Sequence, residues 1–163
     1  MTDAQQYQKA ITMASRAHEG QTDRGGNEYT GHLSAVADGC ESLKAKTTGW
    51  LHDILEDTGC TKEDLIEAGF SREIVDAVVL LTKVYDDDFS YEEYLSRIRN
   101  NPLACEVKKA DLRNNMDLSR LPQVTDRDLE YRKKYEISLM FLEYKLDEAF
   151  VFPDEWSKPG MNL

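Results

Sequence analysis

Apolar residues recur at helical spacing through almost the whole chain, and this periodicity restricts the chain to helix-based folds. Residues 4–18 show the pattern, with one apolar stripe at Tyr7, Ala10, Ile11, Ala14 and Ala17. No segment of useful length alternates apolar and polar residues as a strand would. At 163 residues, 40% of them hydrophobic, the chain can bury one core but not two. We therefore expect a single all-α domain.

Helix start and stop signals place the elements along the chain. The glycine-rich polar residues 19–31 are expected to form a loop, and a capping box at Ser90 and Glu93 opens one helix. The other helices are expected over residues 4–18, 32–43, 45–56, 61–69, 72–83, 102–116 and 126–150. Residues 1–150 would form the domain, and residues 151–163 a C-terminal tail whose Phe152 and Trp156 dock on it.

An adjacent histidine and aspartate, His52 and Asp53, lie within an otherwise apolar helical segment. Burying a charged carboxylate beside an imidazole costs several kcal/mol unless something compensates, and a divalent metal compensates both groups at once. His32 and Asp111 also interrupt apolar patterns. Two imidazoles and two carboxylates suit Mn²⁺, Fe²⁺ or Zn²⁺. Taken singly, each residue also fits an ordinary capping or solvated position, so the metal-site hypothesis depends on their joint occurrence.

Three further polar residues fall near these candidates if the segments are regular helices. Glu56 lies four residues after His52, Asp57 four after Asp53, and Asn115 four after Asp111. Acidic residues at a helix C-terminus oppose the helix dipole, so a solvated helix end explains Glu56 and Asp57 poorly. A carboxylate beside a metal-bound water can accept its proton. We therefore expect Glu56, Asp57 and Asn115 at the rim of the metal site, where a carboxylate can take this role.

Charge and composition limit the partners. The net charge of −11, from 31 acidic and 20 basic residues, repels nucleic-acid polymers and anionic membranes. No apolar run is long enough to span a membrane, the N-terminus lacks the features of a signal peptide, and Cys40, Cys60 and Cys105 form no disulfide or zinc-thiolate pattern. These features predict a cytoplasmic protein and leave open a small phosphorylated molecule as its partner, because a metal and a few local basic side chains can reverse the field inside one cleft. The oligomeric state also stays open.

Five short segments together resemble the hydrolase domain of Rel/SpoT-type alarmone enzymes and the stand-alone small alarmone hydrolases, which are HD-domain phosphohydrolases. The resemblance covers about residues 5 to 145. The segments are Ala17-His-Glu-Gly-Gln21, Tyr29-Thr-Gly-His32, Leu51-His-Asp-Ile-Leu-Glu-Asp-Thr58, Leu81-Thr-Lys83 and Val107-Lys-Lys-Ala-Asp111 with Asn115-Met116.

The resemblance implies an all-α HD-domain fold with one Mn²⁺ and hydrolysis of the 3′-pyrophosphate of ppGpp. By position, the implied metal ligands are His32, His52, Asp53 and Asp111. Glu56 and Asp57 are implied to position and activate water, and Asn115 to contact the nucleoside. His18 falls on a position that is not a ligand in the family, and we expect it to pack or to anchor the following loop.

The chain departs from the family pattern around the nucleoside. Where the family carries Arg-Lys, with the arginine stacked on guanine, this sequence has Asp23-Arg24. Arg24 can still bind phosphate, whereas Asp23 cannot stack as a guanidinium does. The departure predicts weaker recognition of guanine with the metal chemistry retained.

Three functions stay open on the sequence. The first is a metal-dependent phosphohydrolase of nucleotides, with ppGpp as the implied substrate. The second is an HD 5′-nucleotidase acting on nucleoside monophosphates. The third is a metal-binding HD module without activity, against which the intact Glu56-Asp57 pair argues.

Overall fold

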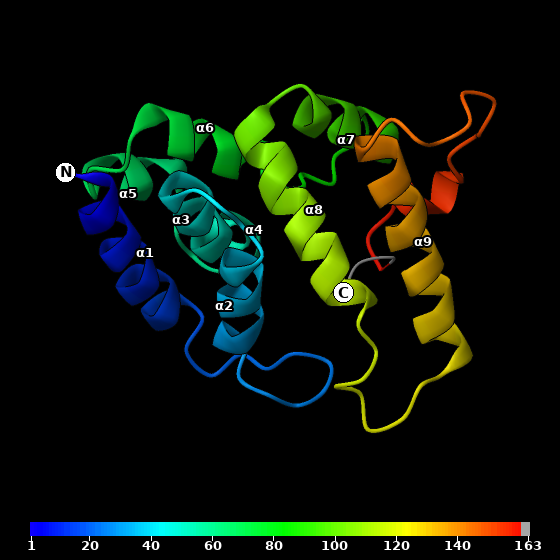
Figure 1. Ribbon diagram of the computed structural model, residues 1–163, viewed down its shortest axis with the longest axis horizontal. Helices are drawn as coiled ribbons and strands as arrows, with labels where there is room; N and C mark the ends of the chain where they lie inside the picture. The colour runs from blue at the N-terminus through cyan, green and yellow to red at the C-terminus, as the bar shows by residue number, and fades with distance from the viewer. Residues whose placement is uncertain (161–163) are drawn as a thin grey trace.

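The computed structural model describes residues 1–160, and it is all-helical, as predicted (Figure 1). The α-helices are α1 Asp3–Ala17, α2 Thr30–Asp38, α3 Leu43–Leu51, α4 Ile54–Asp57, α5 Lys62–Glu67, α6 Arg72–Leu81, α7 Tyr91–Arg99, α8 Pro102–Met116 and α9 Asp126–Leu142. A short 3-10 helix, η1, spans Asp154–Ser157. Within residues 1–160 the only strand-like pairing is an isolated bridge between Thr22 and Glu28, inside the predicted loop.

Most helices begin at a side-chain cap, which is why the sequence signals located them well. Thr2, Thr61 and Thr125 form reciprocal capping boxes, and Ser71 and Ser90 each accept a hydrogen bond from the backbone of the first turn. Such caps stabilise a helix by about 1 kcal/mol each. Pro102 occupies the first turn of α8, as predicted, where its missing N–H costs no hydrogen bond.

Two predicted helices are too long at their C-terminal ends. The helix expected over residues 32–43 stops at Asp38, because Gly39 closes it and Ser42 caps the next helix. The helix expected to reach residue 150 stops at Leu142. Two residues later Tyr144 has φ 58°, in the left-handed region, and the Lys145 N–H bonds back to the Met140 carbonyl. A backbone in that conformation cannot continue a right-handed helix.

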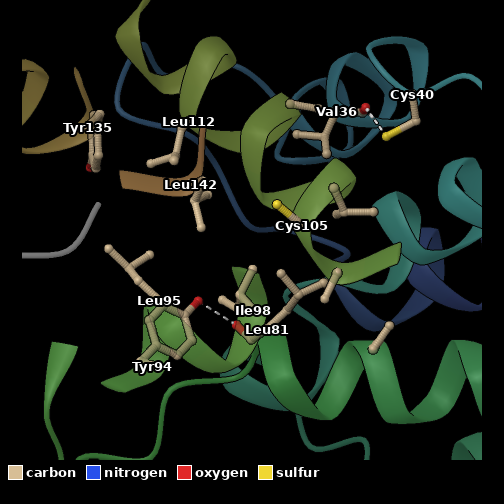
Figure 2. Packing of buried hydrophobic residues seen from close by; sticks show 14 of the residues in the cluster. Val36, Cys40, Leu81, Tyr94, Leu95, Ile98, Cys105, Leu112, Tyr135 and Leu142 are labelled. Atoms are coloured by element: carbon tan, nitrogen blue, oxygen red, sulfur yellow. Dashed lines mark hydrogen bonds between the residues drawn. The ribbon is translucent and has the colours of Figure 1, made fainter. Parts of the chain in front are cut away.

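Helix α8 runs through the middle of the molecule and contacts α2, α3, α6, α7 and α9 (Figure 1). One hydrophobic cluster lies on its α7 and α9 side, where Leu95, Ile98 and Leu112 are fully buried (Figure 2). A second cluster joins α1, α3, α5 and α6 around Leu51, Ile54 and other buried residues. Helices α2, α3 and α6 contribute to both clusters, so they connect the two clusters.

The C-terminal segment packs on α7. The Trp156 ring is 7% exposed and lies edge-on to Tyr91, with ring centroids 6.1 Å apart, and Phe152 contacts the same ring at 6.4 Å. The docking predicted for Phe152 and Trp156 is therefore confirmed, while the domain boundary at residue 150 stays a prediction. None of the helices within residues 1–160 is long and apolar enough to cross a membrane.

Candidate metal centre

His52 and Asp53 lie in a break between α3 and α4, and not within the continuous helix predicted over residues 45–56. The Nδ1 atom of His52 lies 2.6 Å from the Gly49 carbonyl oxygen, the acceptor that an uninterrupted helix would offer to the N–H of Asp53. Asp53 has φ −105° and ψ 1°, outside regular helix geometry. The histidine ring thus replaces a helix hydrogen bond, and the chain turns at the two residues that the sequence singled out.

Both candidate histidine ligands are oriented by a hydrogen bond at Nδ1. His32, in the first turn of α2, places Nδ1 2.8 Å from the Asn114 side-chain oxygen on α8. Because both Nδ1 atoms face oxygen acceptors, they carry a proton, and the Nε2 atoms of His32 and His52 both lie near one oxygen of Asp111, which marks a common centre. This tautomer is the one that binds a metal through Nε2.

The four predicted ligands converge on that centre. The Asp111 Oδ1 atom lies 3.1 Å from His32 Nε2 and 3.4 Å from His52 Nε2. The Asp53 Oδ2 atom lies 3.0 Å from His52 Nε2 and 3.8 Å from His32 Nε2. These side chains come from three separate parts of the chain, so only the tertiary fold brings them together.

The residues fit a divalent cation. His52 Nε2 is buried and has no hydrogen-bond partner within residues 1–160. Burial opposes a charged imidazole, but the carboxylates of Asp53 and Asp111 outweigh it and raise the pKa of His52 well above its usual value. The site therefore favours a positive charge at its centre, and a mixed nitrogen and oxygen donor set suits a divalent transition metal.

The predicted catalytic pair lies next to this centre, on the single turn of α4. Carboxylate oxygens of Asp53, Glu56 and Asp57 lie within 4.8 Å of one another. Glu56 Oε1 accepts a hydrogen bond of 2.7 Å from the Lys83 backbone N–H. Partial burial and the charges of Asp53 and Glu56 raise the pKa of Asp57 to about 6. A carboxylate with such a pKa can accept a proton near neutral pH.

Several residues that support the candidate ligands were not predicted. Lys108 Nζ lies 3.0 Å from Asp111 Oδ2, and the Tyr29 hydroxyl donates to Asp53 Oδ2. Asn115, predicted as a nucleoside contact, donates to Asp111 Oδ1 at 3.1 Å. Lys108 lies three residues before Asp111, so the helical i, i+3 rule could have found it. Asn114 could not be separated from Asn115 without the orientation of α8.

The candidate centre opens into a cavity whose wall carries lysines and tyrosines from α6 to α9. Lys83 follows α6, Tyr91 and Tyr94 are on α7, and Lys134 is on α9. Lys134 had no sequence signal, because its helix carries none of the motifs quoted above. The lining residues around the centre are His32, His52, Asp53, Glu56, Asp57, Lys108 and Asp111.

A second cavity adjoins the first between the loop after α1 and the N-terminal part of α9. Arg24, predicted as a substrate contact, lines this cavity and not the one that all four candidate ligands line. It forms an ion pair with Asp128 and its guanidinium lies 5.4 Å from the centre of the Tyr131 ring. Arg120 lies 3.6 Å from the Asp23 carboxylate. The two cavities share Tyr29, His32, Asn115 and Tyr135.

His18 anchors the loop that forms one wall of this second cavity. Its buried ring places Nδ1 2.8 Å from the Gln21 side-chain oxygen, and the Gln21 amide donates to the Asp57 carbonyl at 2.9 Å. The loop-anchoring role expected for His18 is confirmed. The same contact links the loop to the turn that carries the predicted catalytic pair.

Comparison with characterised proteins finds partial matches. The chain is 35% identical over 82 residues to a guanosine-3′,5′-bis(diphosphate) 3′-pyrophosphohydrolase of Borreliella burgdorferi, a match that covers 48% of this chain and 12% of the relative. It is 32% identical over 124 residues to a probable GTP pyrophosphokinase of Mycobacterium leprae, covering 69% of this chain and 16% of the relative. The chain thus spans less than a fifth of the length of these relatives. No protein-family model matches it.

A solved structure has a similar fold over most of this chain. It is described as a metazoan ortholog of SpoT that hydrolyses ppGpp and plays a role in starvation responses. The TM-score is 0.65 at 20% sequence identity, and the match covers 88% of this chain and 92% of the other. The chain therefore has the helical fold of a SpoT ortholog over most of its length, together with the sequence similarity to Rel/SpoT-type enzymes that its motifs indicated.

Proposed function

We propose that this protein is a metal-dependent phosphohydrolase of nucleotides that removes the 3′-pyrophosphate of ppGpp. The observation that carries the proposal is the convergence of His32, His52, Asp53 and Asp111 beside the carboxylates of Glu56 and Asp57, in one cavity. The partial matches to a pyrophosphohydrolase and the fold of a ppGpp hydrolase support it.

The four convergent residues would hold the metal, and we propose Mn²⁺. A bound divalent ion would lower the pKa of a coordinated water and offset negative charge on the phosphoryl oxygens. Lys108 would keep Asp111 ionised and oriented, as the partner of its second oxygen. The Nδ1 contacts to Gly49 and Asn114 would hold the two imidazoles in place.

The reaction we propose is in-line attack by water on the phosphorus next to the ribose. Asp57, with Glu56 beside it, accepts a proton from the attacking water. The new bond joins the water oxygen to phosphorus, and the bond from phosphorus to the ribose 3′-oxygen breaks. The 3′-oxygen gains a proton, so that the products are a nucleotide with a free 3′-hydroxyl and pyrophosphate.

The second cavity would hold the nucleoside. It directly adjoins the metal cavity and offers the aromatic rings of Tyr131 and Tyr135 for stacking. Arg24 would reach a phosphate of the substrate, and Asn115 lies at the junction of the two cavities.

A product-release assay tests the proposal. The protein is incubated with Mn²⁺ and either ppGpp or a panel of nucleoside monophosphates, and pyrophosphate and orthophosphate are measured separately. We expect pyrophosphate from ppGpp and none after chelation of the metal. Orthophosphate from monophosphates would favour the 5′-nucleotidase, and no release from any nucleotide would favour a binding module.

A further inference from the structure

Asn114, the residue that orients His32, is itself held by an arginine. The Oδ1 atom of Asn114 lies 2.8 Å from His32 Nδ1 and accepts a hydrogen bond of 3.2 Å from Nη2 of Arg120. The same guanidinium nitrogen donates to the Asn114 backbone carbonyl at 3.3 Å. Arg120 belongs to the segment between α8 and α9 and lines only the second cavity. A single asparagine oxygen therefore lies between a candidate metal ligand and a residue outside the metal cavity.

An asparagine amide can turn over, and its two orientations have opposite consequences for His32. With the oxygen toward the ring, Nδ1 carries the proton and Nε2 is available to a metal. With the amide nitrogen toward the ring, Nδ1 has to accept, and the proton of a neutral ring moves to Nε2 and blocks it. Asp111 lies 3.1 Å from His32 Nε2 and would accept that proton, so the second orientation is an accessible alternative.

Arg120 excludes the second orientation, because a guanidinium has donors and no acceptor. The Asn114 atom that faces Arg120 has to be the oxygen, and the same atom faces His32. Asp23 holds the guanidinium from the other side, with its carboxylate 3.6 Å from Nη1 of Arg120. The other oxygen of Asp23 accepts a hydrogen bond of 3.0 Å from the Asn27 N–H, which fixes the carboxylate within its loop.

The backbones of the two segments also meet at this point. A Cβ atom on Gly25 would lie 2.8 Å from the Arg120 carbonyl oxygen, so the loop after α1 rests directly on the segment after α8. An acidic side chain at position 23 suits this packing, because an arginine there would place two like charges side by side. Asp23 thus has a structural partner in this chain.

We propose that Arg120 is a positioning residue for the metal centre. Held by Asp23, it fixes the Asn114 amide with its oxygen toward His32 and so keeps Nε2 of His32 available to the metal. The inference rests on the proposed function for the metal itself, whereas the orientation of Asn114 can be tested without metal. Its consequence is that metal affinity depends on a residue of the second cavity that is not itself a ligand.

Metal affinity gives the first test. Mn²⁺ is titrated into the protein, and the free ion is followed by its electron paramagnetic resonance signal. We expect Arg120→Met to weaken Mn²⁺ binding about tenfold or more, as for other residues that orient a metal ligand. Arg113→Met is the matched control and should leave the affinity unchanged, since Arg113 is the neighbour of Asn114 but pairs with Glu143 at 2.8 Å. Thermal melting establishes that each variant is folded.

Asn114→Asp separates orientation of the amide from a general structural role of Arg120. A carboxylate presents an oxygen to His32 whichever way it turns, so it needs no arginine to select the acceptor. In the Asn114→Asp background we expect Arg120→Met to weaken Mn²⁺ binding less than about threefold. A tenfold loss in that background as well would make Arg120 a structural residue only and would overturn the proposal.

Nitrogen-15 NMR of the metal-free protein reads the orientation directly, at pH 8, where an ordinary imidazole is neutral. We expect the His32 Nδ1 signal of a protonated nitrogen in the wild type and a shift toward the unprotonated position in Arg120→Met. If Arg120→Met does not fold, Asp23→Asn, which loosens the guanidinium, should shift the signal in the same direction.

An unchanged His32 signal in the folded variants would overturn the positioning role, even if Mn²⁺ affinity fell. A shifted signal in a protein that binds no Mn²⁺ and hydrolyses no nucleotide would leave the positioning role standing and refute the proposed hydrolase. Mn²⁺-dependent hydrolysis of ppGpp with an unchanged signal and unchanged Mn²⁺ affinity in Arg120→Met would do the reverse.

Discussion

Asp111 has two roles at the residue scale, because its two oxygens face different partners. Oδ1 lies near the Nε2 atoms of both histidines, and Oδ2 accepts from the buried Lys108 ammonium. A substitution at this position therefore removes a candidate metal ligand and also leaves a buried cation without its counter-charge. The two effects can be separated.

For Asp111→Ala we predict loss of bound metal, measured by emission spectroscopy on protein dialysed against Mn²⁺. The free energy of unfolding of the variant, measured in urea, should also fall by about 3–5 kcal/mol, because Lys108 stays buried and unpaired. Adding Lys108→Met should recover part of the stability and none of the metal. Full metal content in Asp111→Ala would remove Asp111 from the ligand set.

Glu56→Gln and Asp57→Asn keep the size and hydrogen-bonding capacity of the side chains but remove the base. We predict that metal stays bound while kcat for ppGpp falls about 10²- to 10⁴-fold, the usual contribution of general acid–base catalysis. Glu63→Gln on α5, an exposed change of the same type, serves as control. Near-normal turnover in both variants would exclude the pair from the mechanism.

The pH dependence follows from the Asp57 carboxyl, whose pKa is raised to about 6 by partial burial and by Asp53 and Glu56. Only the ionised form accepts a proton, so kcat/KM should decrease as the pH falls through this pKa. A bound cation would offset the charge of Asp53, and we therefore expect the acidic limb somewhat below pH 6. A rate profile from pH 4.5 to 8 measures it. A flat profile in the wild type would contradict a proton-accepting role for Asp57.

At the scale of elements, the contact between α2 and α3 sets the separation of the two histidines. A Cβ atom on Gly49 would lie 3.2 Å from the backbone N and Cα of Ala37, so any larger residue at that position would push the two helices apart by a few tenths of an ångström. His32 lies in the first turn of α2, and His52 follows α3 directly. A change in the distance between α2 and α3 would therefore change the separation of the two histidines at the candidate centre.

We predict that Gly49→Ala destabilises the protein by about 1–3 kcal/mol, the usual cost of overpacking, and lowers the affinity for Mn²⁺. The control is Gly31→Ala on α2, where a Cβ meets no atom within 4 Å and alanine should stabilise the helix slightly. Urea unfolding and metal titration measure both effects. Equal stability of the two variants would show that the contact has no role in spacing the histidines.

The sequence predicted the elements well where a cap or a proline marks a boundary, and poorly where the tertiary structure decides. The break at His52 depends on a ring that bonds back to Gly49, and the end of α9 depends on the left-handed backbone of Tyr144. Neither has a local composition signal. The sequence motifs identified the candidate ligands, whereas only the packing of α9 against the cavity shows that Lys134 lines it.

For the whole molecule, the candidate metal centre lies between the two hydrophobic clusters. His32 belongs to α2 and His52 and Asp53 follow α3, and both helices contribute to both clusters, while Asp111 belongs to α8, which packs in the first cluster. A cation held by all four would link His32 to Asp111, 79 residues further along the chain, as the contact between His32 and Asn114, 82 residues apart, already does. Binding should therefore stabilise the complete fold.

We predict that Mn²⁺ at about a hundred times its Kd stabilises the protein by about 2.7 kcal/mol and raises its Tm by about 5–10 °C. A chelator should reverse the shift, and Asp111→Ala should abolish it. Differential scanning calorimetry with and without Mn²⁺ makes the measurement. An unchanged Tm in the wild type at saturating Mn²⁺ would mean that the four residues do not form a metal site in the folded protein.

The two adjoining cavities have only four lining residues in common, Tyr29, His32, Asn115 and Tyr135. The remaining walls of the outer cavity come from the loop after α1, the segment after α8 and the start of α9, none of which carries a candidate metal ligand. A substitution at Asp23 would therefore reshape the outer cavity without removing a candidate metal ligand. If the outer cavity holds the nucleoside as proposed, the residues that select the base are largely separate from those that would hold the metal.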